Sequence, residues 1–457
     1  MNEILAIIFL CFGLIILFKK IVLSVMQPIL ESSNIKLLGF LALVVGGFLL
    51  YIVDFSWSDR IWKNTLFVFG LFSILRGFIA IFFENMIHKF ANLLFNNYYK
   101  FTIPLSLLFF SLALLMVSRD YMGPLNNIDE CQSDESISVY CGFKNPEDMA
   151  LLPDNKFFIM SEFGGIKPYQ EIDGEGSFAL LRISDGARIL PIIKFEENIW
   201  GDPGCKRNPA DAFGPHGIDL IKRDDGLMQL GVVNHLPFES VEFFELTQNG
   251  DDWSMTWRGC VVAPEENYFN DLSIRRDGSF YVTHMYERDI TVNEWLSAAL
   301  FKYSTGYVLK WDNNNFSKVI GSDGGQPNGI GLDEDSELLY VNYNLSDELK
   351  VINLLNGSSV GRYSINSPDN MIILDNSIWL TSLDHETIDS MGCDLEISVS
   401  CSLPFSIHEI DVVSLKKKNI YSFQETVFGF PTTAYPLNNK IYIGSFHSDR
   451  MAFFQTD

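Results

Sequence analysis

The stretch "FGPHGIDLIKRDDGLMQLGVVNH", Phe213 to His235, decides how most of this chain folds. It consists of an apolar segment, a polar turn with two Asp and a Gly, and a second apolar segment, which together predict a β-hairpin. One histidine, His216, stands near the start of the first strand, and another, His235, ends the second. Because these two ends lie side by side in an antiparallel pair, we expect the two imidazoles to be neighbours.

Five further segments after residue 140 have the same form, with Asp, Asn or Gly in the turn and strands rich in Ile, Val, Tyr and Phe. They are "MALLPDNKFFIMS", "LSIRRDGSFYVTH", "IGLDEDSELLYVNY", "MIILDNSIWLTS" and "AYPLNNKIYIGS". The turns are roughly 40 to 70 residues apart, which suits a four-stranded blade with variable loops. The six units predict an all-β, six-bladed β-propeller over residues 141–457, with a short helical insertion at Thr291–Tyr303.

The first quarter of the chain is different, because four apolar runs there approach the roughly 20 residues that a membrane-spanning helix needs. The runs are Ile4–Phe18, Leu37–Val53, Leu66–Phe83 and Phe101–Val117. A buried soluble helical bundle is the alternative, but its helices would normally show polar faces. We therefore expect an α-helical membrane region with four transmembrane helices at residues 1–120, followed by a linker at 121–140.

Charge follows the same division. Residues 1–120 carry nine basic and six acidic residues, net +3, whereas the remainder carries 24 and 51, net −27. So acidic a body is a poor candidate for binding nucleic acid. The lysines after the first and third apolar runs predict cytoplasmic loops by the positive-inside rule. The propeller is then expected on the extracytoplasmic side, periplasmic or extracellular, of a protein whose helices contact membrane lipid.

Six of the seven cysteines lie in the acidic part: Cys131, Cys141, Cys205, Cys260, Cys393 and Cys401. An even set outside the membrane suggests disulfides. Cys131 with Cys141 and Cys393 with Cys401 are close enough in sequence to form small loops, while the connectivity stays open. Since no CxxC pair occurs, a zinc or redox motif has little support.

Polar residues recur where the inner strand of each blade would begin. They are Glu147–Asp148, His216, Asn270–Asp271, Asn328 and Asp369–Asn370, with Thr432–Thr433 in the sixth unit. Any one of them could be a turn or cap residue, but inner strands line the channel of a propeller, so the whole set should converge. Carboxylate and amide oxygens are the ligands of calcium, which takes six to eight of them. The pattern therefore predicts a calcium site in the channel.

Several blocks, in order, resemble the serum paraoxonase/arylesterase family over about residues 140–457: "PEDMALLP", "FGPHGIDL", "GVVNH", "FNDLSI", "PNGIGL" and "SPDNMIIL". That family folds as a six-bladed propeller with two calcium ions and hydrolyses lactones and aryl esters. The resemblance implies a catalytic calcium held by Glu147, Asn270, Asn328, Asp369 and Asn370. It also implies a structural calcium held by Asp148, Asp271 and the backbone oxygen of Ile218, and the histidine pair His216 and His235.

Together with the apolar runs, the resemblance implies a membrane-anchored, calcium-dependent hydrolase of esters or lactones. Calcium would polarise the carbonyl and stabilise the oxyanion. His216 would take a proton from the attacking water, and His235 would orient it or relay the proton. In the alternative reading of the histidines, they only hydrogen-bond within the strand pair. The alternative function is a non-catalytic propeller, stabilised by calcium, that binds or scaffolds other molecules.

The chain departs from the family at two points. An Asn-Asp-His run is usual after the strand of the third blade, but this chain has Thr283–Tyr286, "THMY". An acidic group near the reaction centre is then missing or supplied from elsewhere. The closing "MAFFQTD" also offers no cysteine for the family's ring-closing disulfide. We therefore expect Cys141 to pair locally and strand pairing to close the ring.

Overall fold

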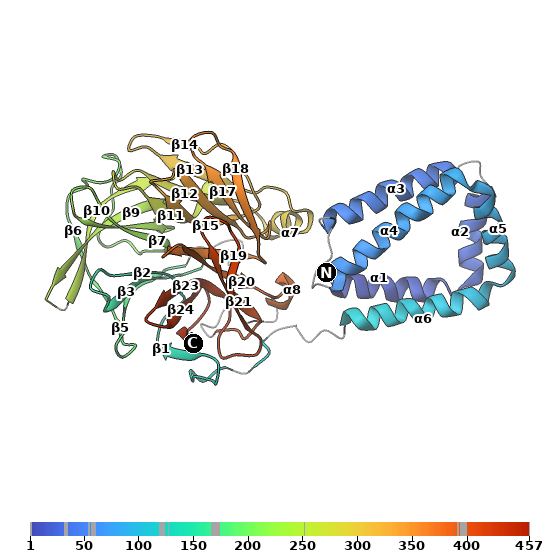
Figure 1. The fold of residues 1–457 in the computed structure, drawn as a ribbon, viewed down its shortest axis with the longest axis horizontal. Coiled ribbons are helices and arrows are strands. Elements are labelled where there is room, and N and C mark those ends of the chain that lie inside the picture. Colours follow the sequence, from blue (N-terminus) through green and yellow to red (C-terminus); the bar gives the residue numbers. More distant parts are fainter. Residues whose placement is uncertain are drawn as a thin grey trace. The chain divides into compact units, whose positions relative to one another are not determined.

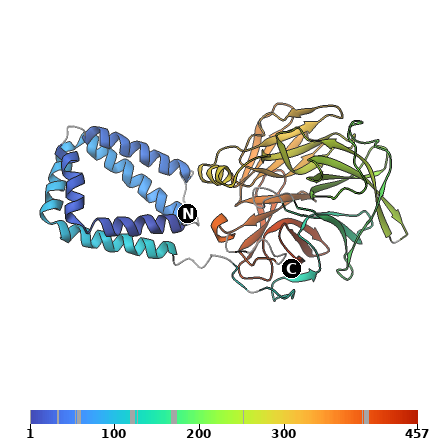
Figure 2. The ribbon, with the colours of Figure 1, turned by 180° about the vertical axis from the view of Figure 1, so that it is seen from behind.

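A computed structural model describes the chain at residues 2–31, 35–53, 55, 61–117, 124–126, 128–165, 174–250, 252–390, 393 and 400–456. The chain forms two compact units, residues 1–120 and 121–457. The first unit is helical, and the second is built mainly of β-strands (Figures 1 and 2). The boundary falls where the apolar runs of the sequence end.

The helical unit contains α1 (Asn2–Ile15), α2 (Lys19–Glu31), α3 (Ile35–Ile52), α4 (Ile61–Phe82), α5 (Glu84–Asn96) and α6 (Tyr98–Val117). Helix α3 packs along α4, and α1 packs along α6 (Figure 1). Among the helices that the structure describes, α3, α4 and α6 are long and apolar enough to cross a membrane. The pair α1 and α2, bent by 93°, would be a fourth span if both helices cross together. These three or four helices confirm the predicted helical region, although α1 ends at Ile15 and not at Phe18.

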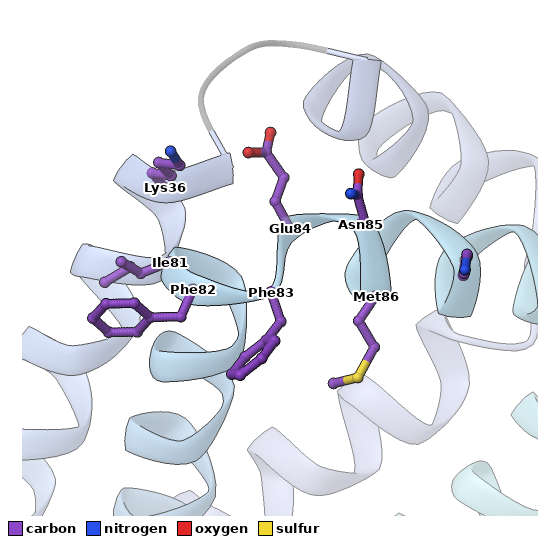
Figure 3. A pocket seen from close by; sticks show the side chains of 8 residues that line it. Lys36, Ile81, Phe82, Phe83, Glu84, Asn85 and Met86 are labelled. Atoms are coloured by element: carbon purple, nitrogen blue, oxygen red, sulfur yellow. The ribbon is translucent and has the colours of Figure 1, made fainter.

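Glycines allow α3 and α4 to approach closely. A Cβ atom on Gly77 would lie 2.6 Å from the carbonyl oxygen of Gly39, so a larger side chain would push the helices apart. A pocket of about 460 Å³ lies where α4 ends and α5 begins (Figure 3). Its lining includes Lys36, at the start of α3, and Lys89, on α5, which follow the first and third apolar runs of the sequence.

The second unit is a six-bladed β-propeller, as predicted. Blade one is β2 (Pro146–Leu151), β3 (Phe157–Glu162), β4 (Ser177–Arg182) and β5 (Arg188–Ile189). Blade two is β7 (Pro215–Lys222), β8 (Met228–Asn234), β9 (Ser240–Asn249) and β10 (Asp252–Val262), with β6 (Ile192–Phe195) parallel to β10. Blade three is β11 (Asn267–Ile274), β12 (Phe280–Glu287), β13 (Tyr307–Trp311) and β14 (Phe316–Lys318).

Blade four is β15 (Pro327–Asp333), β16 (Leu338–Tyr343), β17 (Glu348–Asn353) and β18 (Ser359–Ser364). Blade five is β19 (Pro368–Leu374), β20 (Ser377–Leu383), β21 (Phe405–Asp411) and β22 (Lys417–Phe423). Blade six is β23 (Pro431–Leu437), β24 (Lys440–Ser445), β25 (Arg450–Gln455) and β1 (Ser138–Cys141). The first strands β2, β7, β11, β15, β19 and β23 contact one another in that order, and β23 contacts β2 again. They therefore form the inner ring.

Strand pairing closes the ring, as the sequence predicts, because β1 from the start of the unit pairs with β25 from its end. Cys141 forms its disulfide with Cys131. The fully buried Arg450 donates to the carbonyl oxygen of Ile128 at 2.7 Å. The described part of the expected linker is thus tied to the sixth blade.

Each inner strand has a β-bulge at the position of the recurrent polar residues. In blade two, Pro215 pairs with Asn234 and Ile218 with Val232, so three steps along β7 match two along β8. The other five hairpins also carry one extra residue there. A bulge re-aims side chains and bends the strand. Gly217 lies inside this bulge, where a Cβ atom would be 2.4 Å from Asp271 Oδ1.

The other local predictions also have clear outcomes. The insertion forms helix α7 (Val292–Phe301), which begins with a capping box between Thr291 and Glu294. Cys393 pairs with Cys401, as its spacing suggested, and Cys205 pairs with Cys260 across 55 residues. A short helix, α8 (Thr387–Ser390), follows β20.

Candidate active site

The structure brings the recurrent polar residues together because each lies in the bulge of an inner strand. Glu147 is on β2, His216 on β7, Asn270 on β11, Asn328 on β15 and Asn370 on β19. All are buried, with exposed fractions between 1% and 4%. Direct contacts link four of the strands. The Asn370 amide donates to Glu147 Oε1 at 2.8 Å, His216 Nε2 lies 3.9 Å from the same oxygen, and Asn270 Nδ2 lies 3.4 Å from His216 Nε2.

Four buried carboxylate and amide oxygens of this group have no hydrogen-bonding partner among the described residues. They are Glu147 Oε2, Asn270 Oδ1, Asn328 Oδ1 and Asn370 Oδ1, here called the unpaired oxygens. A buried polar atom without a partner costs roughly 1–3 kcal/mol, so four of them within the inner ring of strands require an explanation. All four belong to residues that the sequence assigns to one calcium site.

The two carboxylates that directly follow Glu147 and Asn270 in the sequence, by contrast, have hydrogen-bonding partners. Asp148 accepts hydrogen bonds from the backbone N–H of Met149 at 2.8 Å and of Ile218 at 2.9 Å. Asp271 accepts from the N–H of Leu272 at 2.8 Å and of Ile330 at 3.0 Å. These two residues, here called the paired carboxylates, each bind the backbone of the next blade. At Ile218 it is therefore the N–H group that meets Asp148.

The channel holds several buried carboxyl groups, and burial is the main cause of their shifted pKa values. It raises the pKa of Asp148 to about 7 and that of Asp369 to about 8, where the charge of Asp148 adds to the effect. The pKa values of Glu147 and Asp271 are also raised well above the usual range, by burial and then by neighbouring carboxylates. A nearby cation would offset both causes.

This donor set can hold a hard cation but offers little to a softer one. Carboxylate and amide oxygens suit calcium, whereas zinc prefers histidine and cysteine. No three His, Cys, Asp or Glu side chains in the described ranges are close enough to hold a metal by themselves. A cation in the channel would therefore depend on the asparagine amides as well as on the carboxylates.

The two histidines of the opening hairpin are neighbours, as predicted. His216 Nδ1 lies 3.0 Å from His235 Nε2. The ring of Phe163 stacks on His216 with 4.4 Å between centroids, and the ring of Tyr268 stacks on His235 at 4.8 Å. Burial, with the neighbouring His235, lowers the pKa of His216 well below its usual value, so the ring is neutral at pH 7. A neutral imidazole can accept a proton.

The sequence did not indicate what else surrounds the histidines. Glu239, in the turn after β8, places Oε2 2.9 Å from His235 Nδ1. A buried aromatic cluster next to them contains Phe163, Tyr268, Met285, Tyr286 and Trp295, the last from α7. Neither feature recurs in the repeats, so the pattern gave no signal for them.

The "THMY" segment, where the chain departs from the paraoxonase pattern, has structural contacts in blade three. Thr283 Oγ1 accepts from the N–H of Asp271 at 3.0 Å, and His284 Nδ1 accepts from the N–H of Tyr268 at 3.1 Å. Burial lowers the pKa of His284 to about 4. Met285 and Tyr286 belong to the aromatic cluster.

Among solved structures, the chain is similar to a gluconolactonase from Xanthomonas campestris, with 11% identity and a TM-score of 0.41 over 74% of this chain and 96% of that one. It is also similar to a luciferin-regenerating enzyme, with 11% identity and a TM-score of 0.42 over 70% of this chain and 95% of that one. A third similar structure is a putative oxidoreductase (glucose dehydrogenase) from Thermus thermophilus, with 11% identity and a TM-score of 0.40 over 70% of this chain and 99% of that one. No curated protein matches the chain. Residues 239–410 match the family model of the SMP-30/Gluconolactonase/LRE-like region, so this part of the propeller is gluconolactonase-like in sequence.

Proposed function

We propose that this protein is a membrane-anchored, calcium-dependent hydrolase of lactones or other carboxylic esters, including aryl esters. The observation that carries the proposal is the set of four unpaired oxygens on four inner strands, two of which belong to residues, Glu147 and Asn270, that lie beside His216 Nε2. The gluconolactonase-like sequence of residues 239–410 supports a lactone as substrate. The resemblance to the paraoxonase/arylesterase family supports the wider class of esters.

Two groups of residues would hold calcium. Glu147, Asn270, Asn328, Asp369 and Asn370 would hold the catalytic ion, because they supply the unpaired oxygens and a buried carboxylate of raised pKa. Asp148, Asp271 and the backbone oxygen of Ile218 would hold a structural ion. Calcium at the first group would act as a Lewis acid toward the substrate carbonyl.

The chain's own residues would perform the proton transfer. His216 Nε2 faces the channel beside Glu147 and Asn270, where it can accept a proton from the attacking water and return it to the leaving alkoxide. His235 supports the opposite side of the imidazole through the contact at Nδ1. The ring of Phe163 covers one face of His216 and limits its access to bulk water.

Three disulfides in the described part of the propeller support an extracytoplasmic location, because cytosolic thiols are kept reduced. The three or four apolar helices would anchor the protein in the membrane. A reporter that is active only outside the cytoplasm, fused after Asp457, should give a signal. A signal only from a cytoplasmic reporter would reverse the proposed topology.

The function is tested with the purified full-length protein in detergent and a panel of lactones and aryl esters, in calcium or in excess chelator. We expect turnover in calcium, loss of turnover and a lower Tm in chelator, and recovery when calcium is restored. Asn270→Ala should abolish most of the activity. Asn314→Ala, an equal truncation on an exposed loop, should leave it unchanged. A calcium-dependent Tm with no turnover on any substrate would favour a binding or scaffold role.

A further inference from the structure

A third residue lies in line with the two histidines. Glu239 is in the turn between β8 and β9, and its side chain is only 3% exposed. One carboxylate oxygen, Oε2, is 2.9 Å from His235 Nδ1, and the other, Oε1, accepts a hydrogen bond from the backbone N–H of Phe269 at 2.7 Å. Phe269 directly precedes Asn270 on β11. Both oxygens of Glu239 therefore have fixed partners, one on each side.

The carboxylate of Glu239 determines which ring nitrogens of the two histidines carry a hydrogen. An ionised carboxylate only accepts hydrogen bonds, so Nδ1 of His235 must carry the hydrogen. In a neutral ring, Nε2 of His235 is then the acceptor, and at 3.0 Å it receives the hydrogen on Nδ1 of His216. Nε2 of His216 is left without a hydrogen. It faces the Asn270 amide nitrogen, a donor, at 3.4 Å, which agrees with this assignment.

We infer that Glu239 is a positioning residue that fixes the tautomers of His235 and His216, so that the unprotonated Nε2 of His216 faces the channel. This inference rests on the proposed function, in which that nitrogen accepts the proton of water. Glu239 would supply the acidic group that the "THMY" segment lacks. It would act from blade two, through His235, and would touch neither substrate nor metal.

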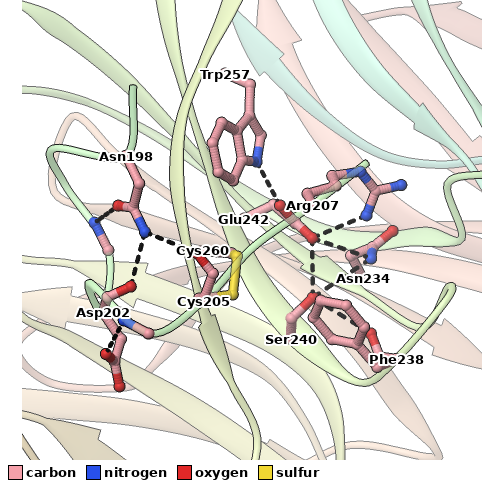
Figure 4. Close-up of a disulfide and its surroundings, with 12 residues drawn as sticks. Asn198, Asp202, Cys205, Arg207, Asn234, Phe238, Ser240, Glu242, Trp257 and Cys260 are labelled. Carbon is pink, nitrogen blue, oxygen red and sulfur yellow. Dashed lines mark hydrogen bonds and ion pairs between the residues drawn. A yellow bond between two sulfur atoms is a disulfide. The ribbon is translucent and has the colours of Figure 1, made fainter. Parts of the chain in front are cut away.

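Hydrogen bonds and a disulfide hold the chain on both sides of Glu239, and Figure 4 shows Arg207, Asn234 and Glu242 among the residues that make them. Asn234 accepts from the N–H of Gly214 and donates to the carbonyl oxygen of Leu236, so it ties the turn to the strand of His216. Arg207, which is fully buried in its side chain, donates to the same Leu236 oxygen at 3.0 Å and to Glu242 Oε1 at 2.9 Å. The disulfide at Cys205 anchors the Arg207 segment to β10.

The competing reading is that Glu239 only holds β11 through Phe269. Glu239→Gln separates the two readings, because its amide has one acceptor and one donor end. If the amide oxygen keeps His235, two N–H donors meet at the 2.7 Å contact with Phe269. If the amide nitrogen faces His235, both rings must carry their hydrogen on Nε2 in place of Nδ1. The two donors that then face each other are His216 Nε2 and Asn270 Nδ2, which are 3.4 Å apart. Two facing donors repel each other less at 3.4 Å than at 2.7 Å, so we expect the hydrogens of both rings to move to Nε2.

The test uses full-length protein in detergent with ¹⁵N-labelled histidine, and ring nitrogen shifts assigned with His216→Asn and His235→Asn. In the wild type we expect both rings to carry hydrogen on Nδ1. In Glu239→Gln we expect both to carry it on Nε2. Glu245→Gln, which changes a mostly buried carboxylate on β9 that is paired with Arg258 on β10, should leave both rings as in the wild type. If His216 carries its hydrogen on Nε2 in the wild type, or if Glu239→Gln changes neither ring, the inference is overturned.

Kinetics give a second readout. Glu239→Gln should lower kcat by roughly 10²-fold and change KM by less than about threefold, because binding of the substrate does not use the tautomer. Glu239→Asp keeps the acceptor and should recover part of kcat. Loss of Tm with unchanged kcat would leave Glu239 a structural residue only. The ring shifts do not depend on turnover. A wild type that shows the expected tautomers but hydrolyses nothing would reject the hydrolase and keep the positioning role.

Discussion

The unpaired oxygens and the paired carboxylates are one residue apart on β2 and β11, yet their surroundings differ completely. Asp148 and Asp271 each accept two backbone N–H groups, one of them from the next blade. Glu147 and Asn270 each have a buried oxygen with no partner in the described structure. The first pair joins the blades through these hydrogen bonds and would share only the structural ion, whereas the second keeps oxygens with no partner at the proposed catalytic site. A bulge thus gives adjacent residues two different tasks, and this contrast predicts which substitutions affect activity and which affect stability.

The largest effect on activity should come from His216, which lies beside Glu147 and Asn270. His216→Gln removes the proton acceptor and should lower kcat by roughly 10²- to 10⁴-fold, with KM less affected. Adding His235→Gln should reduce kcat by less than the product of the single effects, because the two rings act together. Unfolding curves should change little.

His408→Gln is the matched control, since that ring is hydrogen-bonded to Tyr363 and Ser406 on the outer strands. If His216→Gln keeps wild-type turnover while Asn270→Ala loses it, another group accepts the proton. His284 would then be the next residue to examine, although its Nδ1 already accepts from Tyr268.

The second largest effect concerns Asp271. It compares an unpaired oxygen with a paired carboxylate in two adjacent residues, Asn270 and Asp271. Asp271→Ala leaves the N–H groups of Leu272 and Ile330 buried without an acceptor, so the free energy of unfolding should fall by about 2–4 kcal/mol. Asn270→Ala should change it by less than about 1 kcal/mol when both are measured in excess chelator. The measurement is urea unfolding followed by tryptophan fluorescence. Equal losses of stability from the two variants would contradict the division between the sets.

The sequence predicted the features that repeat. Six hairpins with polar turns indicated six blades, and the common offset of residues such as Glu147, Asn270 and Asn328 indicated that they meet. The offset could not distinguish Glu147 from Asp148, because only the bulge decides which side chain keeps an oxygen free. It also gave no sign of Glu239, which occurs once and reaches His235 through the shape of a turn. The pairing of Cys205 with Cys260 likewise depends on how β10 lies beside the preceding loop.

The smallest effect concerns the sixth blade, whose inner strand has Thr432 where the other blades have a carboxylate, amide or imidazole. The Thr432 hydroxyl donates to the carbonyl oxygen of Glu147, so it joins β23 to β2 where the ring closes. Thr432→Val keeps the shape of the side chain and leaves that carbonyl without this donor. The free energy of unfolding should fall by about 1–2 kcal/mol, and kcat should stay within about twofold of the wild type. Thr247→Val, at a half-buried hydroxyl paired with Ser254 on outer strands, is the control and should cost less than about 1 kcal/mol. A large loss of kcat in Thr432→Val with unchanged stability would contradict this expectation. The hydroxyl of Thr432 would then serve activity, by positioning Glu147, and not the stability of the closed ring.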